Sequence, residues 1–219
     1  MVGVILAAGK GTRLKELNLK HKSFAVVKKK HVINFSLDLL VGDDIYPLVE
    51  EIIIVVGHNK EVIIESLGHE YRGVPLTYVH QKELKGVAHA ILTAKDAIKD
   101  DFIMCLADEI LINPNLPAMI EWFRKTDAIC VCGGIYDAED QSGKPIAYET
   151  TTDGYIINVK EKPDTYPNDF RGVGECIFKK ECLDYLSKLV PNQIRGELEM
   201  GDWIQMAADD KKSARIFNI

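Results

Sequence analysis

Short apolar runs alternate with amphipathic stretches along the chain, and this alternation predicts an α/β fold. The apolar runs, which are typical of strands buried on both faces, lie at 2–6, 52–57, 76–79, 102–107 and 128–135. Helical spacing of apolar residues indicates helices at 32–40, 60–67, 87–98 and 114–125. Strands that alternate with helices are typical of βαβ units. We therefore expect an α/β domain with a Rossmann-like, mixed but mainly parallel sheet flanked by helices.

The first apolar run ends in a glycine-rich turn. Gly9 and Gly11 leave room for backbone N–H groups to approach an anion, and Lys10 and Arg13 add positive charge. A Walker A spacing is absent, and a dinucleotide fingerprint needs a glycine where Leu14 stands. A tight turn that binds no ligand is the alternative, but the residue types together favour a phosphate-binding loop after a strand.

A second polar group follows the apolar run at 102–107. Asp108 comes directly after this predicted strand. Ligands of open α/β sheets bind at the carboxyl ends of the strands, where a carboxylate can hold a divalent cation against phosphates. An aspartate that caps the next helix is the alternative. We expect Asp108 to be a metal ligand.

Composition limits the class of protein. The 219 residues suit one large domain, and 47% apolar with 27% charged residues is typical of a soluble globular protein. The net charge of −6 argues against general attraction to nucleic acid or anionic membranes. An anionic substrate would therefore have to be held by local basic groups.

The cysteines and the apolar runs also bear on location. The five cysteines include no Cys-x-x-Cys pair, and their odd number argues against a disulfide framework, so we expect small buried side chains. The first apolar run is too short for a signal peptide, and none approaches the length of a membrane span. We expect a cytoplasmic protein with no membrane partner.

The segment Leu6-Ala7-Ala8-Gly9-Lys10-Gly11-Thr12-Arg13-Leu14 resembles the signature loop of the sugar-phosphate nucleotidylyltransferases, which include glucose-1-phosphate thymidylyl- and uridylyltransferases. The resemblance implies the nucleotide-diphospho-sugar transferase fold in a single domain over 1–219. Residues 1–112 would form its nucleotide-binding half and 113–219 its acceptor-binding half. The nucleotide-binding residues of this loop would be Leu6, Ala7, Ala8, Gly9, Gly11, Thr12 and Arg13.

Later segments extend the resemblance. Lys22 lies in a stretch similar to the family's Pro-Lys segment, with His21 in place of the proline, and would contact phosphates. Gln81 and Gly86 keep the spacing of the residues that read the edge of the base. Asp108 matches the family's metal-binding aspartate, so the resemblance also implies Mg2+ as cofactor.

The acceptor would be held by residues of the second half. The segment at 159–163 resembles the family's Glu-Lys-Pro motif, which assigns Glu161 and Lys162 to the sugar and its phosphate. The segment at 195–202 resembles Gly-Glu-Leu-Glu, which assigns Glu197 to sugar hydroxyls. Lys144 and Pro145 stand where the family usually has Tyr-Gly, so the acceptor can differ from an ordinary hexose phosphate.

The implied activity is a step of nucleotide-sugar biosynthesis. A nucleoside triphosphate, UTP or dTTP, would react with a sugar 1-phosphate to give a nucleotide-sugar and pyrophosphate, with Arg13, Lys22 and Asp108 as the catalytic residues. A cytidylyltransferase for a non-hexose phosphate or phosphonate is one alternative. A non-catalytic nucleotide-binding regulatory module is another.

The end of the chain departs from the family pattern. Residues 213–219 suit the strand that in the family leads to a second metal-binding aspartate, and the sequence stops there. A C-terminal truncation, a substitute acidic group or a weakly active relative would each explain this. The sequence leaves open the base, the acceptor and the oligomeric state, a homo-oligomer included.

Overall fold

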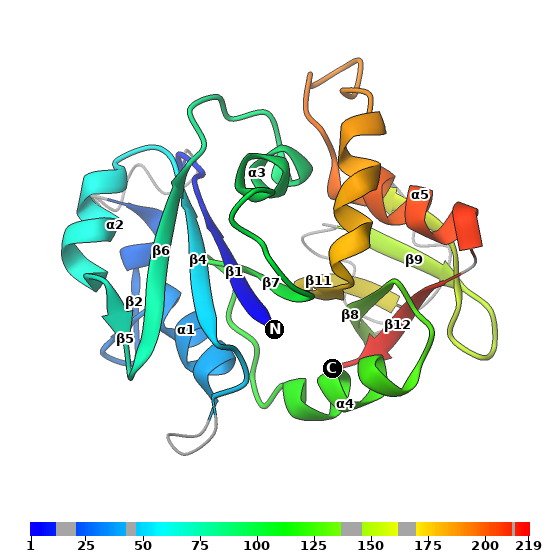
Figure 1. Cartoon of the computed structure of the whole chain (residues 1–219), viewed down its shortest axis with the longest axis horizontal. Helices are drawn as coiled ribbons and strands as arrows, with labels where there is room; N and C mark the ends of the chain where they lie inside the picture. The colour runs from blue at the N-terminus through cyan, green and yellow to red at the C-terminus, as the bar shows by residue number, and fades with distance from the viewer. Residues whose placement is uncertain (12–20, 43–46, 137–145, 162–169, 212) are drawn as a thin grey trace. The chain divides into compact units, whose positions relative to one another are not determined.

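The computed structural model describes residues 1–11, 21–42, 47–136, 146–161, 170–211 and 213–219 (Figure 1). These residues form two compact units. The first contains Met1–Lys85 and Ala90–Asn113, and the second contains Gly86–His89 and Pro114–Ile219. Each unit is built on its own group of strands.

The sheet of the first unit has the order β7-β1-β4-β6-β5. Its strands are β1 (Val2–Ala7), β4 (Glu51–Val56), β5 (Glu70–Tyr71), β6 (Val74–His80) and β7 (Phe102–Leu106). All neighbours are parallel except β5, which runs antiparallel to β6. The central strand β1 is buried along its whole length, as expected for a strand that helices cover on both faces.

The helices of this unit pack closely on its strands. They include α1 (Val32–Val41) and α2 (Lys60–Leu67). The Ser36 hydroxyl of α1 donates to the Leu106 carbonyl at 2.9 Å. A Cβ atom on Gly3 would lie 2.8 Å from Leu40, so glycine in β1 lets α1 approach the sheet. A short 3-10 helix, η2 (Lys22–Phe24), and a hairpin of β2 (Val26–Val27) and β3 (Lys30–His31) precede α1.

The helix predicted at 87–98 is shorter in the structure. It is α3 (Val87–Ala94), and the chain then turns. Both Ala97 N–H and Ile98 N–H donate to the Ala94 carbonyl, at 2.9 and 3.2 Å. These turn hydrogen bonds satisfy the end of the helix, and Ile98 beyond it is buried without being helical.

The sheet of the second unit has the order β10-β9-β11-β8-β12. Its strands are β8 (Cys130–Tyr136), β9 (Ile146–Thr150), β10 (Ile156–Glu161), β11 (Phe170–Phe178) and β12 (Ala214–Asn218). Neighbours are antiparallel except β12, which runs parallel to β8. The turn between β9 and β10 contains Gly154 with φ of 83°, a conformation that glycine adopts without strain.

Three helical segments accompany this sheet, namely α4 (Leu116–Lys125), the 3-10 segment η3 (Lys180–Lys188) and α5 (Met200–Lys211). Trp203 of α5 is fully buried and stacks on Phe178 of β11 with ring centroids 4.2 Å apart. Its indole N–H donates to the Cys182 carbonyl at 2.9 Å. Trp203 therefore anchors α5 between the sheet and η3.

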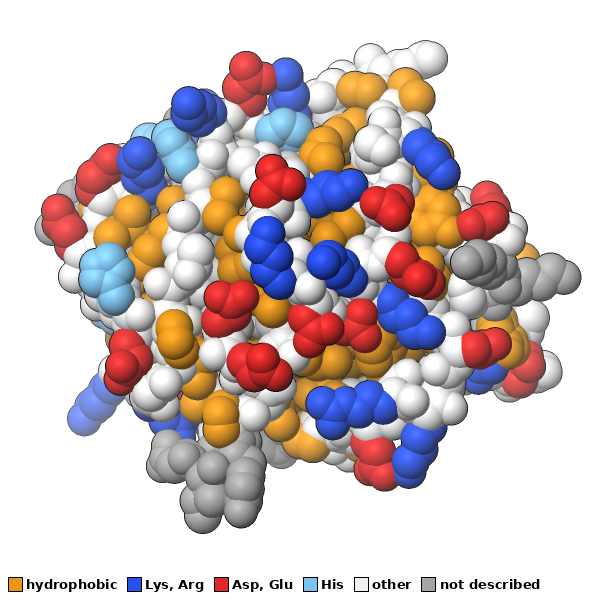
Figure 2. Space-filling model, viewed as in Figure 1, with side chains coloured by type: hydrophobic (Ala, Val, Ile, Leu, Met, Phe, Trp, Pro, Cys, Tyr) orange, Lys and Arg blue, Asp and Glu red, His pale blue; other side chains and the backbone are white. Residues whose placement is uncertain are grey.

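The expectation that the cysteines are small buried side chains is confirmed. All five cysteines are free and buried. Acidic and basic side chains both lie on the face that Figure 2 presents. No helix in the described part of the chain is long and apolar enough to cross a membrane.

Candidate functional site

The carboxyl edge of the first unit's sheet gathers most of the predicted nucleotide-binding residues. Leu6 and Ala7 end β1, and Ala8, Gly9 and Gly11 follow it. Gln81 follows β6, and Asp108 lies two residues after β7. Because β1, β4, β6 and β7 are parallel, their ends lie at one edge, where ligands of such sheets bind.

The glycine-rich loop is supported by the end of β4. The Ala8 carbonyl accepts a hydrogen bond from the His58 N–H at 3.3 Å. A Cβ atom on Gly57 would lie only 2.6 Å from the Ala8 carbonyl oxygen. Gly57 therefore permits a close approach that any larger residue would block, and it fixes the start of the loop.

Lys22 lies along the same loop and reaches Asp108. Its Nζ donates to Asp108 Oδ2 at 2.6 Å. A Cβ atom on Gly9 would lie 3.1 Å from Lys22 Nζ, and one on Gly11 would lie 2.8 Å from Lys22 Cβ. Gly11 also has a φ of 62°, which favours glycine. Gly9 and Gly11 thus leave room for the aliphatic part of the Lys22 side chain.

His21 holds the turn that presents Lys22. It is the N-cap of η2, and the Ser23 N–H donates to its Nδ1 at 3.3 Å. The Ser23 hydroxyl lies 2.7 Å from the same nitrogen. Burial lowers the pKa of His21, and the positive charge of Lys22 lowers it further. A neutral, buried cap therefore stands at the position of the family's proline.

Gln81 belongs to the same edge of the first unit's sheet. Its side chain is buried, and its backbone N–H donates to the Val56 carbonyl at 2.8 Å. The position is thus held by β4 as well as by β6, but its role in reading the base stays a prediction.

Gly86 lies in the second unit, against the segment that holds Glu197. Its φ is 100°, and a Cβ atom there would lie 2.4 Å from the Leu198 carbonyl oxygen and 3.1 Å from Glu197 Cβ. The Leu198 carbonyl also accepts from the Ala88 N–H at 3.2 Å. The structure therefore brings a residue predicted to bind nucleotide against one predicted to bind acceptor.

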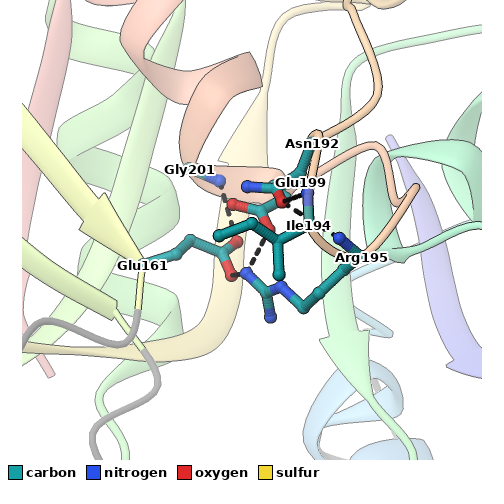
Figure 3. A network of polar contacts seen from close by, with 6 residues as sticks. All are labelled: Glu161, Asn192, Ile194, Arg195, Glu199 and Gly201. Atoms are coloured by element: carbon teal, nitrogen blue, oxygen red, sulfur yellow. Dashed lines mark hydrogen bonds and ion pairs between the residues drawn. The ribbon is translucent and has the colours of Figure 1, made fainter.

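Glu161, the last residue of β10, is part of a polar network (Figure 3). Its Oε1 accepts from the Gly201 N–H at 3.1 Å, and its Oε2 lies 3.9 Å from Arg195 Nη2. The same Arg195 nitrogen donates to Glu199. Sequence reasoning gave Arg195 and Glu199 no role, because they precede α5, where a spacing of four residues does not indicate an ion pair.

Three predicted site residues lie outside the described residues. These are Thr12, Arg13 and Lys162. The segment with Lys144 and Pro145 lies outside them as well. The roles proposed for these residues therefore stay predictions.

The arrangement in the first unit suits an anionic ligand together with a cation. Lys22 and the backbone of the glycine loop offer donors to phosphate oxygens. The Asp108 side chain is 41% exposed and can supply an oxygen ligand. The described residues contain no group of three acidic, histidine or cysteine side chains that could hold a metal by themselves. Mg2+ commonly takes one or two carboxylates and completes its shell with water and substrate phosphates, so Asp108 fits that kind of site.

Comparison with known proteins connects this geometry to a family. The profile described as nucleotidyl transferase matches residues 2–218. A UTP–glucose-1-phosphate uridylyltransferase of Haloferax volcanii is 37% identical over 210 residues, which are 94% of this chain and 83% of that protein. A glucose-1-phosphate thymidylyltransferase of Streptomyces griseus is 27% identical over 220 residues, which are 98% of this chain and 59% of that protein.

Solved structures show the same fold. A UDP-glucose pyrophosphorylase complexed with UDP-glucose superimposes with a TM-score of 0.83 at 24% identity and covers 99% of this chain and 90% of that chain. This likeness confirms the predicted α/β fold class. The family match over nearly the whole chain, together with the relative at 37% identity, shows that the protein belongs to the nucleotidyl transferase family.

Proposed function

We propose that the protein transfers a nucleotidyl group from UTP or dTTP to a sugar 1-phosphate and releases pyrophosphate. The names of the relatives from Haloferax volcanii and Streptomyces griseus support this reaction. The observation that carries the proposal is the Lys22–Asp108 pair, which lies beside the glycine loop where β1 and β7 end. A cation, a carboxylate and backbone donors then meet where the triphosphate would lie.

The reaction needs alignment and charge stabilisation more than proton transfer. A phosphate oxygen of the sugar 1-phosphate attacks the α-phosphorus, and the bond from that phosphorus to the pyrophosphate oxygen breaks. The attacking oxygen is already ionised, so no general base is required. Both reactants are anions, and the protein must offset their repulsion while it holds them in line.

Lys22 is the described cation best placed for this task. Its Nζ lies against the glycine loop and can turn from Asp108 to a phosphate oxygen. Arg13, four residues beyond Gly9, keeps its predicted role on the leaving pyrophosphate. An ammonium for the α-phosphate and a guanidinium for the pyrophosphate would stabilise the charge that the reaction shifts.

Asp108 would hold Mg2+ as one of its ligands. The metal, when bound, neutralises phosphate charge and orients the α-phosphate. The carboxylate is partly exposed and already carries a cationic partner in Lys22, which favours an exchange of partners when the nucleotide enters. Asp108 thus keeps its charge compensated with and without substrate.

The residues of the motifs would recognise the two substrates. Gln81 and Gly86 would read the base edge. Glu161 and Glu197 would bind the sugar hydroxyls, and Lys162 would bind the sugar phosphate. These assignments rest on the motifs at these positions and on the contacts that hold Gly86, Glu161 and Glu197 in one unit.

Pyrophosphate release tests the proposal. The purified protein, with Mg2+, is assayed with each common nucleoside triphosphate against sugar 1-phosphates, polyol phosphates and phosphonates. Turnover with UTP or dTTP and a sugar 1-phosphate is the expected result. Turnover with CTP and a non-sugar acceptor alone would identify a cytidylyltransferase instead. Nucleotide binding without any turnover would favour a regulatory module.

A further inference from the structure

The carboxylate of Glu161 is held from two sides. On one side, the Gly201 N–H in the first turn of α5 donates to Oε1 at 3.1 Å. On the other, Arg195 Nη2 lies 3.9 Å from Oε2 (Figure 3). The free N–H groups at a helix start and a guanidinium both favour the ionised carboxylate. Glu161 is therefore fixed in orientation and in charge.

Arg195 contacts two carboxylates at once. Its Nη2 donates to Glu199 and also faces Glu161. The side chains of Glu199 and Glu161 are only 7% and 18% exposed, whereas that of Arg195 is 29% exposed. Carboxylates removed from water need a compensating charge. Without Arg195, two poorly solvated carboxylates would repel each other.

The loop that carries Arg195 is closed by its own hydrogen bonds. Asn192 Oδ1 accepts from the Ile194 N–H at 2.9 Å and from the Arg195 N–H at 3.2 Å. The Asn192 N–H donates to the Glu197 carbonyl at 2.8 Å, and its carbonyl accepts from the Gly196 N–H at 2.7 Å. Asn192 thus sets the backbone from which Arg195 points toward Glu161.

From this network we propose that Arg195 is a positioning residue of the acceptor site. It fixes the Glu161 carboxylate for the sugar hydroxyls, and the Asn192 loop places Arg195 and Glu197 together. This inference rests on the proposed function. A hydroxyl donor is recognised best by a carboxylate that is ionised and already oriented, because less ordering is then needed on binding.

The first test replaces Arg195 by glutamine. The Arg195→Gln variant removes the charge and keeps a polar side chain of similar reach. We expect the KM for the sugar 1-phosphate to rise about 10- to 150-fold, the range for losing a hydrogen bond to a charged group. We expect the KM for the nucleoside triphosphate to stay within about 2-fold, since only acceptor binding loses energy.

Two further variants, Arg195→Lys and Lys125→Gln, make this test more specific. Arg195→Lys keeps the charge but lacks the planar guanidinium group. Its KM for the acceptor should therefore lie between those of the wild type and Arg195→Gln. Lys125→Gln breaks the surface pair between Lys125 and Glu121 at 2.5 Å in the same unit and should leave both KM values unchanged. A rise of the acceptor KM in Lys125→Gln as large as in Arg195→Gln would make the effect one of general charge and overturn the assignment.

Replacing Gly201 tests independently whether the position of the Glu161 carboxylate matters. A Cβ atom there would lie 2.8 Å from Glu161 Cγ, so Gly201→Ala must push Glu161 away. Alanine is otherwise the better helix former. We therefore expect a raised acceptor KM without a fall in melting temperature, which separates loss of position from loss of folding.

Binding by calorimetry distinguishes failure of this inference from failure of the proposed function. If the wild type binds a sugar 1-phosphate but does not turn it over, the proposed reaction is excluded. If Arg195→Gln then binds the sugar 1-phosphate more weakly than the wild type, the role of Arg195 is supported. Equal acceptor binding by wild type and a folded Arg195→Gln variant would overturn the inference, as would a wild type that binds no sugar phosphate.

Discussion

Lys22 and Asp108 are 86 residues apart in the sequence, yet Lys22 Nζ lies 2.6 Å from Asp108 Oδ2. Lys22 follows the cap of η2, and Asp108 follows β7. Their side chains are 20% and 41% exposed, and ion pairs this accessible to water add little to the stability of a fold. The pair is therefore better explained by the ligand that would separate it than by a structural need.

Replacing Lys22 should damage the reaction without damaging the fold. In Lys22→Gln we expect kcat/KM to fall about 10- to 150-fold, as for the loss of a charged hydrogen bond, and the free energy of unfolding to change by less than about 1 kcal/mol. Steady-state kinetics and urea unfolding measure the two quantities. Unchanged kcat/KM would exclude Lys22 from the site.

The close contact between Gly57 and Ala8 predicts that there is no room for a side chain at position 57. Gly57→Ala would place a Cβ 2.6 Å from the Ala8 carbonyl oxygen. We expect a cost of about 1–3 kcal/mol in stability from overpacking and a raised KM for the nucleoside triphosphate as Ala8 moves.

Gly68→Ala is the matched control for that variant. Gly68 has a φ of 69°, but a Cβ there would meet no atom within 4 Å. The Gly68→Ala variant should lower the stability of the protein through backbone strain and leave the KM for the nucleoside triphosphate unchanged. If both variants change the nucleotide KM equally, destabilisation rather than loop displacement is the cause.

The buried His21 predicts a dependence of stability on pH. Burial, followed by the charge of Lys22, lowers the pKa of His21 below its usual 6.5. The unfolded chain therefore binds the proton more readily than the folded one, so this contribution to stability is present above about pH 6.5 and is lost as the pH falls. The loss is at most about 1.4 kcal/mol per pH unit.

Urea unfolding at pH 7.5 and 5.5 measures this effect. His21→Asn keeps a side-chain acceptor at the N-cap but does not titrate. We expect a smaller stability difference between the two pH values in His21→Asn than in the wild type. An equal difference in both proteins would show that other groups cause the pH dependence.

The hairpin of β2 and β3 turns through two lysines in unfavourable conformations. Lys28 and Lys29 have φ values of 49° and 66°. Asparagine followed by glycine suits such a two-residue turn. The double variant Lys28→Asn, Lys29→Gly should gain about 1 kcal/mol or more and raise the melting temperature by about 2–4 °C. Lys28→Gln, Lys29→Gln removes the same charges without relief of strain and should gain nothing.

The sequence predicted β1, β4 and β7 because each of these strands buries both faces. The runs at 52–57 and 102–107 are apolar throughout, and both are buried strands in the structure. It also placed Asp108 at a strand end. It could not predict that Lys22 reaches Asp108, because that contact depends on how the glycines at 9 and 11 make room for the lysine.

Other features escaped prediction for different physical reasons. The end of α3 at Ala94 is set by turn hydrogen bonds, while the apolar pattern continues past it. The contact of Gly86 with Leu198 joins segments that are distant in sequence. Arg195 and Glu199 lie four residues apart, but they precede α5, where that spacing does not indicate an ion pair. The cytoplasmic location and Mg2+ dependence stay predictions.

Tracing the phosphorus atoms of the triphosphate tests the central claim most directly. UTP or dTTP labelled at the α-phosphate is incubated with glucose 1-phosphate and Mg2+, beside the Asp108→Asn variant. We predict that the α label enters a nucleotide-sugar and that label at the γ-phosphate enters pyrophosphate. In Asp108→Asn the rate should fall about 100- to 1,000-fold, as for other losses of charge stabilisation. Label released as orthophosphate, or a wild-type rate in Asp108→Asn, would contradict the account.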